Sequence, residues 1–516
     1  MNLQQLLDGV EVVACNGETS VNGVQFDSRS VHPGDVFIAI KGETADGNSF
    51  IDPAIKGGAA AIITDSAQAT PRMGVAWVVV TDGRRALARI SANFYGHPEA
   101  KLAITGITGT NGKTTTSFLL ESILTADGRK SALVGTIEYH LPGRVLPAPH
   151  TTPESLELEE LFAEAVSSQA TEVVMEVSSH ALAQGRVYGI PFNVAVFTNL
   201  TRDHLDYHLS LPEYFAAKRL LFSGCGTEPP VWVVANIDDE HGQALAAFSK
   251  SRSQLLTYGL EQGDFHAARI AVGQNGTRFD LVTPNGAIPI WTPLVGKINV
   301  YNILAAVAAA YARGCPATAI SKGIAALLRV PGRFEKVDMG QPFTVVVDYA
   351  HTDDALRNLT AIARDFVAGV ESGGLGQRAQ VITVFGCGGD RDRTKRPLMG
   401  EAAGRGSDLV VLTSDNPRSE DPVHIMNDAL PGLQHTGTRY ILEPDRRKAI
   451  EMAIDEARAG DIVLIAGKGH ETKQVGLAGS MEFDDVEVAR KALVRNGFDQ
   501  SDRHPSPPKD RQAVLS

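Results

Sequence analysis

The segment GITGTNGKTT, residues 106–115, is the most informative part of this 516-residue chain. It follows an apolar segment at residues 101–105, which we expect to be a buried strand, and it opens a helix that begins near Lys113. In such an arrangement backbone N–H groups surround phosphate oxygens, the lysine neutralises the terminal phosphates, and Thr114 can bind Mg²⁺. Ile107 stands where the usual spacing has its first glycine, so a glycine turn before an ordinary helix is the alternative. We predict a nucleotide-binding loop.

Apolar segments of strand length alternate with helical segments around this loop. The expected central strands are residues 101–105, 172–175 and 194–197. Strand, crossover helix and strand in succession predict a parallel sheet. A hairpin is expected over residues 277–292, and an alanine-rich helix over residues 302–313 is expected to end this part of the chain.

The length of the chain suggests about three domains, and the alternation of strands and helices predicts the α/β class. We expect a small α/β domain over residues 1–98, with strands at 36–40 and 77–80. The central parallel-sheet domain would span residues 99–332, with a hinge at 331–333. A third, Rossmann-like α/β domain is expected over residues 333–498, with strands at 344–347, 381–385, 409–412 and 462–465. The polar, proline-rich residues 499–516 are expected to be a disordered tail.

The charge and cysteine content restrict the class of partner. A net charge of −12 argues against a nucleic acid or an anionic membrane as the main partner. The four cysteines are far apart and form no CxxC pair, which favours reduced thiols in the cytoplasm over disulfides or a zinc site. The sequence shows neither a signal peptide nor an apolar run long enough to cross a bilayer. We therefore predict a cytoplasmic protein without membrane insertion.

Polar residues after the predicted strands are candidates for magnesium binding. Glu176 ends the strand at 172–175, beside the predicted phosphate loop, where a carboxylate can hold Mg²⁺. A surface carboxylate is the alternative. His204 and Lys218 follow the next strand, and taken alone they could equally be a structural histidine and an ordinary helix lysine.

Four segments in succession resemble the Mur ligases: TGTNGKTTT (108–116), MEVSSHAL (175–182), TNLTRDHLDYH (198–208) and FAAKRLLF (215–222). The resemblance spans nearly the whole chain and implies ATP-dependent amide-bond formation. It implies that Thr114 and Glu176 hold one Mg²⁺. A second Mg²⁺ would be held by His204 together with Lys218, whose amine would carry a CO₂-derived carbamate. Lys113, Lys218 and His204 would be the catalytic residues. The implied ATP-binding residues are Gly109, Thr110, Asn111, Gly112, Lys113, Thr114, Thr115, Asn302, Arg333 and Asp348.

The same resemblance implies a binding site for a UDP-linked sugar–peptide. Residues 27–37 resemble the first-domain motif of the diaminopimelate- and lysine-adding branches, although Pro-Gly-Asp at 33–35 is also a good turn by itself. Arg186 suits a carboxylate, because its planar fork can bind both oxygens. The implied substrate residues are Phe26, Ser28, Glu43, Thr44, Ala45, His150, Thr151, Thr152, Ser178, Gln184 and Arg186. His150 departs from the family pattern, which often has asparagine there.

The segment DNPR at residues 415–418 is found in the family members that add meso-diaminopimelate. This amino acid has a distal carboxylate and ammonium that do not react. Arg418 and Arg391 would bind the carboxylate, and Asp415 and Glu471 the ammonium. Read without the family, the segment could be a helix-capping turn with a solvated arginine. The implied diaminopimelate residues are Arg391, Asp415, Asn416, Pro417, Arg418, Gly467 and Glu471.

The resemblance thus implies a monomeric cytoplasmic ligase that joins meso-diaminopimelate to UDP-N-acetylmuramoyl-L-alanyl-D-glutamate. Such an enzyme would serve peptidoglycan synthesis, and through it cell shape and division. A lysine-adding ligase and a folylpolyglutamate synthetase-like ligase are the nearest alternatives. A P-loop switch or transport ATPase belongs to another class and would not need Lys218 or the DNPR segment. A non-catalytic nucleotide-sugar sensor would bind the substrate but release no phosphate, and the presence of Lys113, Glu176, His204 and Lys218 argues against it.

Overall fold

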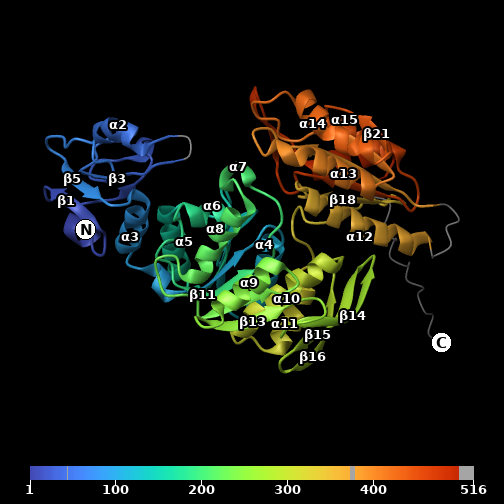
Figure 1. Ribbon diagram of the computed structural model, residues 1–516, viewed down its shortest axis with the longest axis horizontal. Helices are drawn as coiled ribbons and strands as arrows, with labels where there is room; N and C mark the ends of the chain where they lie inside the picture. The colour runs from blue at the N-terminus through green and yellow to red at the C-terminus, as the bar shows by residue number, and fades with distance from the viewer. Residues whose placement is uncertain (43–44, 372–377, 499–516) are drawn as a thin grey trace, which may run out of the picture. The chain divides into compact units, whose positions relative to one another are not determined.

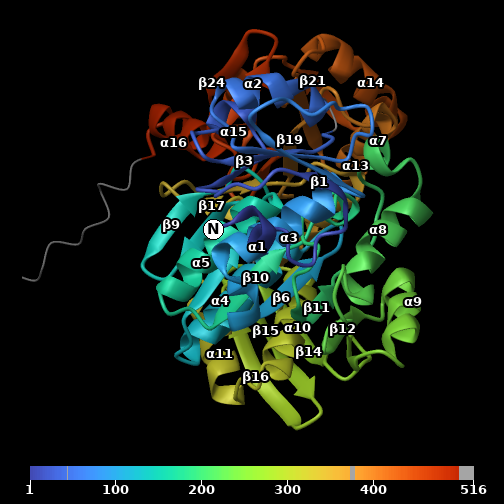
Figure 2. The same cartoon turned by 90° about the vertical axis from the view of Figure 1, so that its left-hand side faces the viewer.

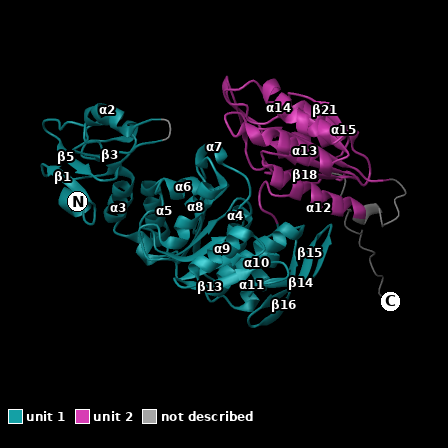
Figure 3. Cartoon of the chain, viewed as in Figure 1, with its two compact units in different colours: residues 1–328 teal, residues 329–516 magenta. Residues whose placement is uncertain are grey.

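The computed structural model describes residues 1–42, 45–371 and 378–498, with the side chains of 369–371 left out. The chain forms two compact units, Met1–Leu328 and Arg329–Ser516 (Figure 3). The predicted tail, residues 499–516, lies outside the described residues. The predicted domain boundaries at residues 98 and 332 stay predictions. No helix in the described segments is both long and apolar enough to cross a bilayer.

The first unit begins with a five-stranded sheet in the order β1-β5-β4-β3-β2. This sheet is the blue, N-terminal part of the chain in Figure 1. Its strands are parallel except β1, which pairs antiparallel with β5. The strands are β1 (Val12–Asn16), β2 (Val24–Gln25), β3 (Val36–Ala39), β4 (Ala61–Thr64) and β5 (Ala76–Val80). The accompanying helices are α1 (Leu3–Leu6), α2 (Ile51–Lys56) and α3 (Gly83–Tyr95), with short 3₁₀ helices η1 (Ser28–Ser30), η2 (Gly47–Phe50) and η3 (Pro98–Lys101). The predicted strands at 36–40 and 77–80 are confirmed as β3 and β5.

The larger part of this unit is built on an eight-stranded sheet in the order β13-β12-β11-β6-β10-β7-β8-β9. The first six strands are parallel, as predicted, and β8 and β9 extend the edge antiparallel. The strands are β6 (Ala103–Thr108), β7 (Ser131–Val134), β8 (Glu138–Leu141), β9 (Arg144–Pro147), β10 (Glu172–Glu176), β11 (Phe192–Phe197), β12 (Trp232–Asn236) and β13 (Gln254–Tyr258). β10 is buried along its whole length, as a central parallel strand should be.

Helices cover both faces of this sheet (Figure 2). Two apolar cores lie between the sheet and these helices. One core joins the sheet to α4 (Lys113–Ala126), α10 (Lys297–Ala312) and α11 (Ala317–Ala326). The other joins it to α5 (Ser155–Ser167), α8 (Leu211–Ser223) and α9 (Glu240–Ser249). Two short helices, α6 (Ser179–Ala183) and α7 (Leu205–His208), follow β10 and β11. They carry part of the candidate site.

Two expectations for this unit need correction, and a third is confirmed as part of a larger element. The strand predicted at 101–105 is β6, Ala103–Thr108, because Pro98 begins a 3₁₀ helix that occupies Lys101. The helix predicted at 302–313 begins at Lys297, after Gly296, and α11 follows it, so it does not end this part of the chain. The hairpin predicted at 277–292 is confirmed, but it belongs to a three-stranded meander of β14 (His266–Gly273), β15 (Gly276–Thr283) and β16 (Gly286–Thr292).

The second unit is a six-stranded sheet in the order β17-β18-β22-β19-β20-β21, parallel except for the edge strand β17. All four predicted strands are present. The strands are β17 (Glu335–Val337), β18 (Thr344–Asp348), β19 (Val381–Cys387), β20 (Leu409–Ser414), β21 (Arg439–Leu442) and β22 (Ile462–Ala466), and a hairpin of β23 (Lys473–Gly476) and β24 (Gly479–Glu482) follows. The helices are α12 (Asp353–Glu371), α13 (Arg396–Gly406), α14 (Pro422–His435), α15 (Arg446–Glu456) and α16 (Asp485–Arg495), with η4 (Arg393–Lys395) before α13. Apolar cores lie on both faces, so the Rossmann-like prediction is confirmed.

Candidate functional site

The predicted phosphate loop connects β6 to α4 in the first unit. Its glycines have left-handed backbone geometry, with φ of 150° at Gly109 and 90° at Gly112. A Cβ at Gly112 would lie 2.5 Å from Asn302 Oδ1, which places Asn302, one of the predicted ATP-binding residues, against the loop. Gly112 caps α4 without a side-chain hydrogen bond. The first N–H groups of α4 are therefore not satisfied by a capping side chain, as an anion-binding helix start requires.

The segment after β11 holds the rim of this loop. Asn111 N donates to Asn199 Oδ1 (2.9 Å), and Thr198 Oγ1 donates to Asn111 O (2.6 Å). Thr110 N donates to Asn199 O (2.9 Å). These hydrogen bonds from the Thr-Asn-Leu segment at residues 198–200 fix the backbone of the phosphate loop.

The two predicted catalytic lysines meet at one carbonyl oxygen of the loop. Lys113 Nζ donates to Gly109 O (3.0 Å) and Thr110 O (3.0 Å), and Lys218 Nζ donates to Gly109 O (2.8 Å). Lys218 is only 1% exposed. Its burial, and then the charge of Lys113, hold its pKa well below the usual range, against the opposing effect of Asp203. This burial favours the neutral, nucleophilic form of the Lys218 amine over the ammonium.

Glu176, at the carboxyl end of β10, faces the start of α4. Its Oε2 accepts hydrogen bonds from Thr114 Oγ1 (3.0 Å) and Thr136 Oγ1 (2.9 Å), and its Oε1 accepts one from Thr136 N (2.9 Å). The glutamate is fully buried. This set of hydroxyl and carboxylate oxygens is the hard donor set that Mg²⁺ prefers, so the residues present fit the ion. The described residues contain no group of three or more His, Cys, Asp or Glu side chains arranged for a metal.

His204 lies in a cluster of aromatic and imidazole rings. Its ring centroid is 4.8 Å from that of His180, and its Nε2 is 3.4 Å from Asp203 Oδ2. Burial, outweighing the effect of Asp203, lowers the pKa of His204 to about 3, and the nearby cations act in the same direction. The imidazole is therefore neutral at pH 7 and has a lone pair for a metal. His180, which the sequence interpretation gave no role, is part of the same cluster.

Residues predicted for the sugar–peptide substrate gather beyond the end of β10. Thr152 Oγ1 donates to Glu176 O (2.8 Å) and accepts from Ser178 N (3.1 Å). Arg186 donates from Nη1 to Thr152 O (2.9 Å) and from Nε to Gln184 Oε1 (2.9 Å). Thr151 is joined to the same group by its hydroxyl contact with Thr136 (3.1 Å), whereas the His150 side chain is exposed.

The remaining predicted substrate residues lie in the first sheet region. Phe26 packs half-buried against the core of that sheet, and Ser28 begins η1. Ala45 is exposed, and Gly42 N donates to its carbonyl oxygen (2.9 Å). Glu43 and Thr44 lie outside the described residues.

Arg84 of α3 connects these two groups. Its Nε donates to Lys41 O (3.1 Å), and its Nη1 donates to Glu154 Oε2 (3.3 Å) and Gln184 O (3.4 Å). Arg186 Nε also lies 3.0 Å from Glu154 Oε1. The carboxylate of Glu154 is therefore shared by two arginines, and the segment at Lys41 is tied to the segment at Gln184.

In the second unit, loops at the carboxyl ends of three parallel strands bring together the residues predicted for diaminopimelate. Asn416 Nδ2 donates to Glu471 Oε2 (2.8 Å). Arg418 Nη1 donates to Gly389 O (2.6 Å), in the loop that carries Arg391. Burial, and then the like charge of Arg391, lower the pKa of Arg418. Two arginines repelling each other favour an anion between them.

Asp415 and Gly467 are in direct contact in this loop cluster. Asp415 is buried, and its Oδ2 accepts no hydrogen bond from the described part of the chain. A Cβ at Gly467 would lie 2.5 Å from that oxygen. Pro417 occupies the turn between Asn416 and Arg418. The unpaired carboxylate oxygen is suited to an ammonium donor.

The two other predicted ATP residues lie near the start of this unit. Asp348, at the end of β18, accepts hydrogen bonds from Phe334 N (2.7 Å) and Ala350 N (2.8 Å). Its burial raises its pKa, against the effect of Arg333. The Arg333 guanidinium lies 4.5 Å from the Tyr349 ring centroid.

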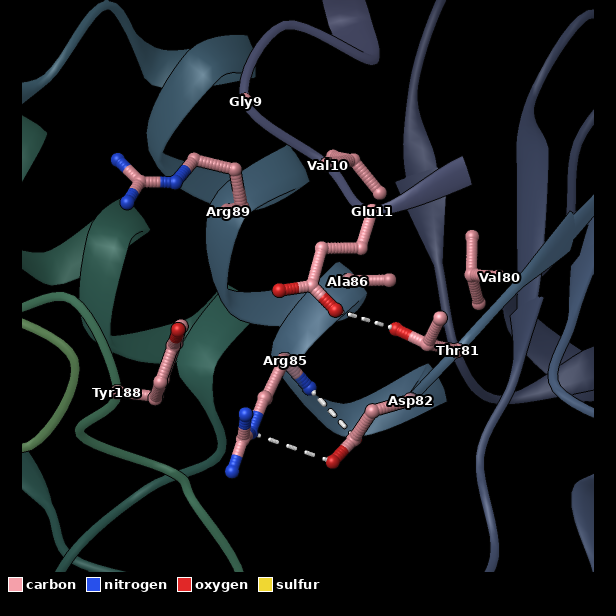
Figure 4. A pocket seen from close by; sticks show the side chains of 10 residues that line it. All are labelled: Gly9, Val10, Glu11, Val80, Thr81, Asp82, Arg85, Ala86, Arg89 and Tyr188. Atoms are coloured by element: carbon pink, nitrogen blue, oxygen red, sulfur yellow. Dashed lines mark hydrogen bonds and ion pairs between the residues drawn. The ribbon is translucent and has the colours of Figure 1, made fainter. Parts of the chain in front are cut away.

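A pocket beside α3 is lined by none of the predicted site residues (Figure 4). In it Thr81 Oγ1 donates to Glu11 Oε2 (2.8 Å), and the Arg85 guanidinium lies 5.2 Å from the Tyr188 ring centroid. Its lining residues are Gly9, Val10, Glu11, Val80, Thr81, Asp82, Arg85, Ala86, Arg89 and Tyr188, none of them a predicted ligand.

Several residues of these networks were missed from the sequence. Thr136 follows β7, and a strand prediction at 131–134 would have placed it at the same sheet edge as Glu176. Lys468, fully buried, donates to Asn416 Oδ1 (3.1 Å) and Glu471 Oε2 (2.9 Å). Its position beside Gly467 in the segment at 466–471 was the available signal. Arg84 and Glu154 had no local signal, because their contacts join residues far apart in the chain.

Comparison with known proteins agrees with this geometry. The chain matches the families described as Mur ligase family, catalytic domain (residues 20–95), Mur ligase middle domain (107–310) and Mur ligase, glutamate ligase domain (332–469). It is 52% identical to the UDP-N-acetylmuramoyl-L-alanyl-D-glutamate–2,6-diaminopimelate ligase of Solibacter usitatus, over 97% of this chain and 100% of that protein. The enzyme of the same name from Geobacillus thermodenitrificans is 45% identical over 96% and 99% of the two chains. A solved structure bearing this enzyme name is 35% identical, with a TM-score of 0.63 and coverage of 92% and 95%. The chain belongs to the Mur ligase family.

Proposed function

We propose that this chain is the ATP-dependent ligase that joins meso-diaminopimelate to the D-glutamyl residue of UDP-N-acetylmuramoyl-L-alanyl-D-glutamate. Relatives named for this reaction are 42% to 52% identical and align with almost the full chain. The observation that carries the choice of amine is the loop cluster in which Asp415 presents an unpaired carboxylate oxygen and Arg418 lies near a second arginine. An amino acid with a distal ammonium and a distal carboxylate matches this charge pattern.

Two Mg²⁺ ions have candidate ligands in the first unit. Thr114 and Glu176 would hold one, and His204 with a carbamate on Lys218 the other. The carbamate forms when the neutral Lys218 amine attacks CO₂ and loses a proton, which turns a nitrogen donor into two oxygen donors. The burial that lowers the pKa of Lys218 favours this reaction. When bound, the ions would neutralise charge on the phosphates and on the substrate carboxylate.

The residues of the loop would let two anionic groups approach each other. Lys113 and the N–H groups at the start of α4 would hold the ATP phosphates while the γ-phosphoryl group passes to the γ-carboxylate of D-glutamate, releasing ADP. The amine of diaminopimelate then attacks the acyl phosphate, and the tetrahedral intermediate expels phosphate and gives up a proton. Arg186 would orient the sugar–peptide through a substrate carboxylate.

Substitution of Lys113 tests this assignment. We expect Lys113→Met to slow single-turnover acyl-phosphate formation by about 100-fold or more, because a charge acting on the transferring phosphoryl group is lost. The dissociation constant of the UDP-substrate, measured by calorimetry, should change less than about twofold. Lys130→Met is the control, since Lys130 is exposed and its Nζ donates to Gln169 Oε1, away from the loop. Equal losses in both measurements for Lys113→Met would contradict the assignment.

The amine is identified by ADP release in the presence of meso-diaminopimelate, L-lysine or L-ornithine. The proposal requires release that depends on meso-diaminopimelate and on the UDP-linked dipeptide. Release with L-lysine at the same efficiency would favour the lysine-adding alternative, and release with a folate substrate would favour the folylpolyglutamate alternative. ATP hydrolysis that needs no amine would point to a P-loop ATPase.

We place this activity in the cytoplasm, in a monomer that supplies peptidoglycan synthesis and so contributes to cell shape and division. The four cysteines, which are far apart and form no CxxC pair, favour a reducing compartment. Both the nucleotide and the UDP-linked precursor are small anions, and the chain offers them local cations despite its net negative charge.

A further inference from the structure

A completely buried ion pair lies beneath the loops that carry Asp415 and Gly467. It joins Arg446, the first residue of α15, to Asp485, the first residue of α16, and both side chains are 0% exposed. Two hydrogen bonds form the pair, from Nε to Oδ1 (2.8 Å) and from Nη2 to Oδ2 (2.7 Å). Apolar residues can often replace a buried ion pair at no loss of stability, so stability alone does not explain its presence.

The remaining donors of Arg446 reach the ends of two strands. Nη2 donates to Ala466 O (3.0 Å), at the last residue of β22, and Nη1 donates to Ser414 O (3.3 Å), at the last residue of β20. These strands do not pair, because β19 lies between them. Arg446 therefore ties together two strand ends that the backbone ladder does not join directly.

The residues that follow these two carbonyl groups belong to the candidate diaminopimelate site. Ser414 is followed by Asp415, and Ala466 is followed by Gly467 and the turn that bears Glu471. Burial acts to lower the pKa of Arg446. Asp485 opposes this effect most strongly, followed by Asp415 and Glu471, so that the pKa is raised above its usual value. The positive charge of Arg446 therefore acts on both carboxylates of the site. Arg446 thus acts on the site in two ways, through its hydrogen bonds to two backbone carbonyl groups and through its positive charge.

We propose that Arg446, oriented by Asp485, is a positioning residue for the incoming amino acid. It sets the separation between Asp415 and the turn at Gly467–Glu471, and with it the fit of the ammonium end. A guanidinium is required, because a single ammonium group cannot bind both carboxylate oxygens and two carbonyl groups in one plane. This inference rests on the proposed function, which supplies the amino acid that the site would hold.

The test compares Arg446→Lys and Asp485→Asn with the wild-type chain. We expect Arg446→Lys to raise the KM for meso-diaminopimelate by about tenfold to a hundredfold, as small misplacements at a site do. The KM values for ATP and for the UDP-substrate should stay within about twofold of wild type. Asp485→Asn keeps the guanidinium and one acceptor oxygen, so it should give a smaller rise in the same constant. It also provides a measurement if Arg446→Lys does not fold.

Arg439→Lys is the matched control. It alters an arginine of the same unit whose ion pair with Glu456 is exposed, at 61% and 41%. All three KM values should be unchanged in this variant. Thermal unfolding of each variant shows whether the chain is folded in the assay.

A selective rise in the KM for meso-diaminopimelate supports the inference. A folded Arg446→Lys variant with wild-type KM for this amine, or an equal rise in all three KM values, overturns it. A wild-type chain that shows no amine-dependent ADP release overturns the proposed function itself, which is a different result from any change seen only in the variants.

Discussion

Gly467→Ala should weaken binding of the amine donor by displacing Asp415. Gly467 has a φ of 121°, and a Cβ there would lie 2.5 Å from Asp415 Oδ2. Carbon and oxygen atoms cannot approach so closely without one moving, and Asp415 carries the atom in contact. The new methyl group would therefore push away the carboxylate oxygen that we assign to the substrate ammonium.

The size of the effect follows from the lost contact. A hydrogen bond to a charged group contributes about 1.5–3 kcal/mol, and about 1.4 kcal/mol corresponds to a tenfold change in affinity. The KM for meso-diaminopimelate should rise about 10- to 140-fold if that contact is lost. The left-handed backbone adds a strain of about 1–3 kcal/mol, which lowers the melting temperature but not specifically the affinity.

Gly479→Ala separates strain from displacement. Gly479 has a similar φ of 106°, and a Cβ there would meet no atom within 4 Å. Both variants are assayed for amine-dependent ADP release, with ATP and the UDP-substrate saturating, and both are melted. The reasoning is refuted if the two variants have the same KM for meso-diaminopimelate within about twofold.

Three further substitutions test other parts of the first unit. Burial acts to lower the pKa of His140, but its hydrogen-bonded neighbour Glu121 helps to raise the pKa to about 9. We therefore expect His140→Gln to lower the free energy of unfolding at pH 6 by about 2–3 kcal/mol. In denaturation experiments this difference from wild type should be lost as the pH rises through about 9. Burial, and then the neighbouring Glu99, raise the pKa of Glu159 to about 9. We therefore expect Glu159→Gln to stabilise the chain by more than about 1 kcal/mol at pH 8 and by little at pH 5. Thermal unfolding measures this difference. Gly112→Ala should weaken ADP binding about tenfold in calorimetry, because its φ is 90° and the contact at the loop is strained.

The signs of the two pH effects provide their controls. A histidine with a raised pKa stabilises the fold below about pH 6.5, so a pH-independent loss in His140→Gln would show that packing, not charge, is responsible. A carboxyl group with a raised pKa makes the fold less stable as the pH rises from about 4.5 toward 9, so Glu159→Gln must diverge from wild type in that window. For Gly112→Ala, an equal loss of UDP-substrate binding would indicate general misfolding.

Much of the architecture could be predicted from local sequence patterns. The apolar segments at 172–175, 344–347 and 462–465 are central strands, buried along nearly all of their length, and such segments carry their own signal. The loop at Gly109–Lys113 was equally clear, since left-handed glycines and a helix start are local features. The antiparallel strands β8 and β9 were not predicted, because they are short and partly exposed edge strands with a weak pattern.

The candidate site was predicted less completely, for a physical reason. Residues such as Glu176 and Asp415 stand at strand ends, where the sequence itself shows their position. Arg84 and Arg446 act through hydrogen bonds to backbone carbonyl groups that are distant in the chain. The residues next to an arginine in the sequence do not indicate which carbonyl group it will bind. Such hydrogen bonds are therefore seen only in the three-dimensional structure.

The division of the chain after Leu328 has an evolutionary consequence. All the side chains that we assign to the amine lie beyond that point, on loops of one sheet, whereas the loop at Gly109–Lys113 and its partner Glu176 lie before it. The amine substrate could therefore change during evolution through substitutions in the second unit alone, while the residues for phosphate chemistry in the first unit stay the same. Chimaeras joined at this position would be a direct way to change which amine the ligase adds to its UDP-linked substrate.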